Sequence, residues 1–137
     1  MTDQVHALAG QEIVNPRTGQ RMIFRTTADD SAGRELVIEC WSPPESQGAS
    51  REPMHTHPNQ EKRFEVIDGE LTIMIDGRER VMRAGEEVTI GPREAHCFWN
   101  AGASEVHYWQ EFRPALRSAA AALTSFALYG KAGGQNV

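Results

Sequence analysis

Three histidines carry the chemistry that the sequence suggests most directly. His55 and His57 are two positions apart, and in an extended segment side chains at this spacing point to the same face. Two imidazoles on one face can bind the same metal ion, although two histidines at this spacing also occur in polar surface loops. His96, in a turn that leads into a further apolar segment, completes a set of three imidazoles. Such a set binds zinc or iron and leaves coordination positions open.

The segments around these histidines have the pattern of short β-strands. Through most of residues 21–113, short apolar or aromatic runs alternate with turns that contain glycine or aspartate. Asp76-Gly77 between two apolar runs predicts a tight hairpin, because glycine accepts the positive φ of a type I′ turn. Many short strands at this spacing predict an all-β barrel or sandwich, and closure of a barrel brings the three histidines together.

The two ends of the chain differ from this middle part. Residues 1–20 mix glycine and proline with short apolar pieces, so we expect a loose lead-in or an arm exchanged with a second subunit. Residues 114–130 have a helical pattern, in which Pro114 suits the first position and Gly130 suits the stop. We therefore predict a β-barrel over residues 21–113 followed by one C-terminal α-helix, with its apolar side on the barrel or on a partner subunit.

Composition excludes several classes of partner. A chain of 137 residues with 39% hydrophobic and 24% charged residues is typical of one soluble globular domain. Its net charge of −5, without a run of basic residues, argues against nucleic acid as a partner. No apolar stretch approaches the roughly 20 residues of a membrane span, and the first residues do not resemble a secretory signal. Two cysteines suit a reducing compartment, so we expect a cytoplasmic protein with a small-molecule partner.

The motifs around the histidines resemble those of the cupin superfamily. The first cupin motif is similar to His55-x-His57 followed by Phe64-Glu65-Val66-Ile67-Asp68-Gly69, and the second to Gly85, Pro92, His96 and Asn100. The resemblance covers about residues 35 to 113 and implies a jelly-roll β-barrel with one divalent metal ion. Zinc is the first expectation, and iron, manganese or nickel are alternatives. Cupins include isomerases, dioxygenases, cyclases, epimerases and binding proteins, so the resemblance leaves the reaction open.

One position departs from the cupin pattern. The family usually has a glutamate ligand five residues after the second histidine, where this chain has Lys62. Gln60, Glu61 and His107 are the candidates for a replacement ligand, although a shift of one residue along a strand reverses the direction of the side chain. Glu61 is also a candidate catalytic residue. Another interpretation is that the metal site is lost and that the barrel only binds a ligand or serves as a scaffold.

The last predicted strand supplies a second candidate catalytic residue. Alternation along residues 105–112 places Tyr108, Gln110 and Phe112 on one face, which we assign to the interior. A buried amide needs hydrogen-bond partners, so Gln110 faces substrate or metal-bound water, or else is a satisfied core amide. The remaining wall should be apolar and suits a flat ligand with few oxygens. The predicted substrate-pocket residues are Trp41, Met54, Phe64, Val66, Ile73, Phe98, Tyr108 and Phe112.

Three hypotheses for function follow. The first is an enzyme whose metal ion polarises a carbonyl of an aromatic or polyketone metabolite in a cyclisation or aldol-type reaction, similar to the monocupin cyclases of aromatic polyketide pathways. The second is an iron- or manganese-dependent dioxygenase of a small metabolite. The third is a non-catalytic small-molecule binder. A homodimer is expected in each case, because pairing of edge strands or an exchanged arm buries exposed strand edges.

Overall fold

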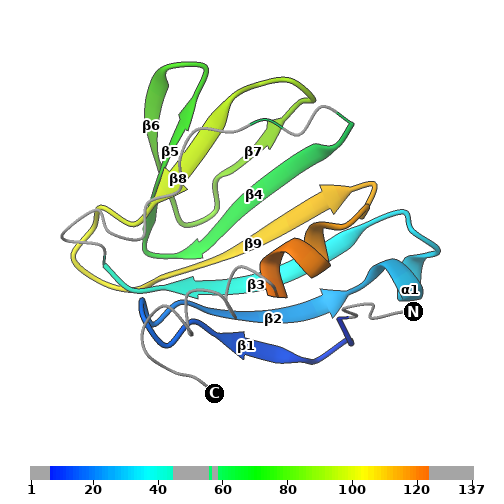
Figure 1. Ribbon diagram of the computed structural model, residues 1–137. Helices are drawn as coiled ribbons and strands as arrows, with labels where there is room; N and C mark the ends of the chain where they lie inside the picture. The colour runs from blue at the N-terminus through cyan, green and yellow to red at the C-terminus, as the bar shows by residue number, and fades with distance from the viewer. Residues whose placement is uncertain (1–6, 45–55, 57–58, 124–137) are drawn as a thin grey trace.

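The computed structural model describes residues 7–44, 56 and 59–123, which form two antiparallel sheets (Figure 1). The larger sheet has the strand order β1-β2-β3-β9-β4-β7 and the smaller sheet the order β6-β5-β8. Figure 1 shows the smaller sheet beside β4 and β7 of the larger one. This arrangement confirms the predicted all-β fold of the jelly-roll type. None of the helices in the described ranges has the length and apolar character needed to cross a membrane.

The strands are short, as the spacing of the turns predicts. Their bounds are β1 Glu12–Val14, β2 Arg21–Thr26, β3 Leu36–Ser42, β4 Glu61–Asp68, β5 Glu70–Ile75, β6 Arg78–Arg83, β7 Glu87–Ile90, β8 His96–Trp99 and β9 Val106–Arg113. A one-turn helix, α1 (Ala28–Ser31), joins β2 to β3 and begins at a capping box formed by Thr27 and Asp30. Burial alternates strictly along β3, so one side of this strand faces the core and the other faces outward.

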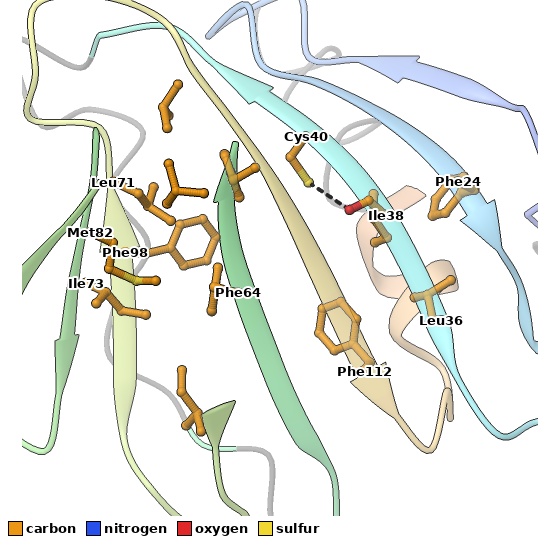
Figure 2. Close-up of a cluster of buried hydrophobic side chains, with 14 of the residues drawn as sticks. Phe24, Leu36, Ile38, Cys40, Phe64, Leu71, Ile73, Met82, Phe98 and Phe112 are labelled. Atoms are coloured by element: carbon orange, nitrogen blue, oxygen red, sulfur yellow. Dashed lines mark hydrogen bonds between the residues drawn. The ribbon is translucent and has the colours of Figure 1, made fainter. Parts of the chain in front are cut away.

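The facing sides of the two sheets bury a cluster of apolar side chains. Figure 2 shows Phe64 of the larger sheet beside Phe98 of the smaller sheet, and their ring centroids are 4.9 Å apart. Burial of side chains of this size stabilises the fold by about 1.5–3 kcal/mol each. The larger members of the cluster are Phe24, Leu36, Ile38, Phe64, Val66, Leu71, Ile73, Met82, Ile90, Phe98, Tyr108 and Phe112.

Two turns that contain glycine connect the strands at β5, one to β4 and one to β6. Asp76 and Gly77 both have positive φ, 49° and 82°, which confirms the predicted hairpin between β5 and β6. Gly69, between β4 and β5, has φ 87°, and a Cβ at this position would lie 2.7 Å from the carbonyl oxygen of Glu105. Only glycine fits this crossing without displacing the neighbouring backbone.

The N-terminal segment is more ordered than a loose lead-in. Within residues 1–20, β1 pairs antiparallel with β2 of the same chain, with Glu12 opposite Ile23. The short apolar pair Ile13-Val14 is the sequence signal for this strand. Exchange of this arm between two subunits stays a prediction.

The C-terminal helix begins later than predicted. Helical residues start at 118 and continue to 123, where the described part of the chain ends, so the predicted end at Gly130 lies outside it. Leu116 has φ 48°, in the left-handed region, so residues 114–117 form a turn and not the first helical turn. Ala119, Ala122 and Leu123 pack against the core of the barrel.

Candidate functional site

His96 is buried between the two sheets, with 1% of its surface exposed. It lies two residues before Phe98 on β8, and alternation therefore turns both side chains to the interior. Its Nδ1 is 3.1 Å from the carbonyl oxygen of Glu94. When Nδ1 carries the proton and donates it to this carbonyl, the lone pair is on Nε2, as in a histidine that is held ready to bind a metal ion.

The turn before β8 holds this imidazole in position. The backbone N–H of Gly91 donates to Glu94 Oε1 at 2.7 Å, which closes the turn. Ala95 is tied to the tip of the β5–β6 hairpin twice: its N–H donates to Asp76 Oδ1 at 3.0 Å, and its carbonyl accepts from Asp76 N at 2.8 Å. His96 is thus fixed between a closed turn and a neighbouring hairpin.

The other two predicted histidine ligands, His55 and His57, lie outside the described residues, as does Met54. The three-histidine site therefore stays a prediction. Within residues 7–44, 56 and 59–123, no group of three or more His, Cys, Asp or Glu side chains is placed to hold a metal ion. In this part of the chain, His96 is the predicted ligand whose position supports the site.

Lys62 faces the interior of the barrel. On β4 it alternates inward with Phe64 and Val66, and only 4% of its surface is exposed. Its Nζ lies 4.9 Å from the ring centroid of Phe64, 5.0 Å from that of Phe98 and 4.8 Å from that of Phe112. Aromatic faces attract an ammonium group, so three rings stabilise this charge inside the barrel. The position that resembles a cupin ligand therefore holds an inward-facing lysine whose protonated form is favoured by three aromatic rings.

Gln60 and Glu61 are not brought to His96 by the structure. The Gln60 side-chain amide donates to the carbonyl of Pro114 at 2.8 Å, to that of Ala115 at 3.2 Å and to Ser118 Oγ at 2.8 Å. It thereby joins the start of β4 to the turn before the C-terminal helix. Glu61 is exposed on the face of β4 opposite to Lys62, which is the reversal expected for a shift of one residue.

His107 lies on the outer face of the larger sheet, away from His96. Its Nε2 is 2.6 Å from Glu39 Oε2, and its ring stacks on Trp41 with centroids 4.7 Å apart. The Arg21 guanidinium covers the same tryptophan at 4.0 Å from the ring centroid. Trp41 is therefore part of an outer stack and does not line the interior, because β3 alternates with Cys40 inward.

Glu39 is the charged centre of this outer cluster. Arg25 Nη2 lies 2.7 Å from Glu39 Oε1, on the side opposite to the contact with His107. Burial raises the pKa of Glu39, but hydrogen bonds from Arg25 and His107 outweigh burial and hold the pKa below its usual 4.5. These contacts engage the outer histidine in a structural network.

Gln110 faces the interior, as predicted from the alternation along β9. It is 3% exposed, lies opposite Phe64 on β4, and its Nε2 is 3.3 Å from Cys40 Sγ. Sulfur is a weak acceptor, so this contact uses little of the hydrogen-bonding capacity of the amide. The position is compatible with a group that binds a substrate oxygen and also with a core amide. Tyr108, on the same face, has its hydroxyl 3.0 Å from Ser42 Oγ.

The other predicted pocket residues are interior residues. Phe98 meets the ring of Tyr108 with centroids 6.1 Å apart, besides its contact with Phe64. The inward direction of Lys62 was not predicted, although its alternation with two apolar neighbours on β4 is a sequence signal for it. The predicted pocket residues buried in the core are Phe64, Val66, Ile73, Phe98, Tyr108 and Phe112.

Comparison with known sequences gives a match at the family level. Residues 46–109 match the family described as cupin domain. An oxidoreductase from Arthrobotrys oligospora is 30% identical over 87 residues, which are 63% of this chain. The chain spans about a third of the length of that relative, since the match covers 32% of it.

Solved structures with the same fold cover most of the chain. A protein described as a predicted oxalate decarboxylase from Thermotoga maritima has a TM-score of 0.65 and 17% identity, over 83% of this chain and 99% of that chain. An RmlC-like cupin from Shewanella frigidimarina has a TM-score of 0.62 and 18% identity, over 86% and 98%. Ectoine synthase from P. lautus has a TM-score of 0.62 and 16% identity, over 80% and 73%. At these identities the likeness shows the fold alone.

Proposed function

Since residues 46–109 match the family described as cupin domain and the fold is that of a solved cupin, we propose that the protein is a metal-dependent enzyme that converts a small molecule inside its barrel. The proposed ligands are His55, His57 and His96, with zinc as the first candidate ion. The observation that carries the proposal is the buried His96 imidazole, with Nδ1 3.1 Å from the Glu94 carbonyl. A histidine held in this way offers Nε2 to a metal ion.

The presence of Lys62 at the usual glutamate position supports a proposed ligand set of histidines without a carboxylate. The ammonium group of Lys62 has no lone pair, so it does not coordinate a metal ion. Three neutral imidazoles leave more positive charge on the ion than a set that includes a carboxylate. When bound, such an ion supplies Lewis-acid polarisation of a carbonyl oxygen.

The rest of the proposed chemistry belongs to side chains of the chain itself. In this proposal the inward Gln110 amide holds a substrate oxygen, and the buried aromatic residues around Phe64 exclude water and pack against a flat, largely apolar molecule. These features favour a cyclisation or aldol-type reaction of an aromatic or polyketone metabolite, as in the polyketide cyclases that the motifs resemble.

A second candidate function is oxidation of a small metabolite with iron or manganese. The sequence relative described as an oxidoreductase supports it. The two candidates differ in their use of oxygen: the first predicts turnover without oxygen, and the second predicts stoichiometric oxygen uptake.

Elemental analysis tests the metal site directly. We expect about one zinc per chain in protein purified without added metal, and less than a tenth of that in His96→Ala. The matched control is His107→Ala, which removes an imidazole from the outer face and should keep the metal. Iron in place of zinc would favour oxidation. Protein that holds no metal, even after incubation with zinc, would leave only the third hypothesis, a binder whose ligand affinity is unchanged in His55→Ala, His57→Ala and His96→Ala.

A further inference from the structure

Lys62 combines burial with a defined aromatic setting. Its ammonium group is enclosed by the rings of Phe64, Phe98 and Phe112, with Nζ 4.8 to 5.0 Å from each centroid, and the residue is 4% exposed. An aromatic face attracts a cation through its quadrupole and has no comparable attraction for a neutral amine. This setting favours a role through positive charge over a role as a nucleophilic amine.

The position of Lys62 relates it to the other interior polar groups. Phe98, which lies 5.0 Å from Nζ, is two residues from His96 on the same face of β8. Gln110 pairs with Phe64, the other ring near Nζ, across the β4–β9 ladder. An ammonium, an imidazole and an amide therefore border the same aromatic part of the interior.

We propose that Lys62 is an anion-binding residue and that the interior site takes a small carboxylate with a flat, apolar body. A carboxylate oxygen accepts hydrogen bonds from the ammonium group in surroundings where charges attract more strongly than in water. The apolar body packs against the phenylalanine rings. This inference rests on the proposed function in that it uses the same interior site, but the contact with Lys62 does not depend on the metal ion.

The test compares carboxylates with neutral molecules of the same shape. Binding of acetate, benzoate and 2-naphthoate, and of the corresponding amides, is measured by titration calorimetry on the full chain, after removal of metal with EDTA and again after loading with zinc. We expect at least one carboxylate to bind tenfold or more tightly than its amide, with and without zinc. In Lys62→Met this preference should fall to less than twofold, whereas Lys62→Arg should keep most of it.

Arg63→Gln is the matched control, because it removes one positive charge from the next residue of the same strand, on the outer face. Its carboxylate preference should equal that of the wild type. Circular dichroism confirms folding, and Lys62→Gln replaces the methionine variant if that variant does not fold. The proposal is overturned if no carboxylate is preferred over its amide, or if the preference persists in both neutral Lys62 variants.

The same titrations separate this proposal from the proposed function. A preference that needs zinc and is indifferent to Lys62 would place the carboxylate on the metal ion, which overturns the role of Lys62 and keeps the metal site. A preference that depends on Lys62 in a protein that never holds metal would keep the anion site and refute the metal-dependent function.

Discussion

On the outer face of the larger sheet, His107 Nε2 lies 2.6 Å from Glu39 Oε2, and the alternation along β9 turns this imidazole away from the interior that holds His96. The same strand, β9, turns Gln110 to the interior three residues later. One strand therefore separates a structural charge network from the candidate site.

The Glu39 network predicts a defined pH dependence of stability. The pKa of Glu39 is lowered in the folded protein, so its contribution is fully present above about 4.5, its usual value, and is lost as the pH falls through the lower folded pKa. We expect Glu39→Gln to lower the free energy of unfolding by about 1–2 kcal/mol at pH 7. Urea unfolding of both proteins at pH 7 and pH 3 measures this. A difference that does not shrink at pH 3 would contradict the assignment.

Lys62→Glu restores a carboxylate at the position where the cupin motif has a ligand. Without metal, the variant should lose about 1–3 kcal/mol of stability, because a buried carboxylate faces the negative faces of three rings. We expect the variant to bind zinc about 10- to 100-fold more tightly than the wild type does, which is the usual effect of one additional partner in a metal site. Thermal unfolding with EDTA and with zinc reports both effects, with Lys62→Gln as the control. Equal zinc affinity in the two variants would refute this geometry.

Gly69 combines a positive φ with a close backbone contact, whereas Gly85 has a positive φ alone. Comparison of the two glycines therefore separates the two effects. Gly69→Ala places a Cβ 2.7 Å from the Glu105 carbonyl oxygen and also forces alanine to φ 87°. The left-handed conformation alone costs about 1–2 kcal/mol, and the close contact should add about 1–3 kcal/mol. Gly85→Ala, at φ 90° with open space around the added Cβ, should show only the first cost. Equal losses in chemical unfolding would show that the backbone at Gly69 moves aside.

Gln60→Ala tests the link between β4 and the C-terminal helix. Loss of the contacts with Pro114, Ala115 and Ser118 should lower stability by about 1–3 kcal/mol. It should also speed hydrogen exchange at residues 118–123. Glu61→Ala, at the next residue on the exposed face, should change stability by less than about 0.5 kcal/mol. Unchanged exchange at residues 118–123 in the Gln60 variant would show that the helix docks without this amide.

The sequence predicted those parts of the fold that depend on local rules. Period-two alternation placed Gln110 inside, and Asp76-Gly77 marked a hairpin, because side-chain direction and turn type are local properties. The apolar ring of Trp41 predicts an interior position, yet that ring is covered on the outer face by Arg21 and His107. Arg21 and His107 lie on β2 and β9, the strands on either side of β3. A single sequence does not reveal which strands become neighbours.

The start of the helix and the role of Gln60 show a second limit. Pro114 suits a first helical position, but the positive φ of Leu116 follows from a turn that is tied to distant residues. Gln60 is one of these, 54 residues away from Pro114 in the sequence. A contact of this range depends on the finished fold, so propensity alone does not predict it.

The pair of hydrogen bonds between Asp76 and Ala95 joins the candidate site to a surface hairpin. Local opening of this hairpin breaks both bonds and releases the residue directly before His96, so the closed hairpin is one of the restraints on the imidazole, beside the contact with Glu94. Each opening of the hairpin therefore loosens the backbone beside the imidazole for as long as the hairpin stays open. A substitution at its exposed tip, far from the aromatic interior, would act on the site through kinetics and not through contact.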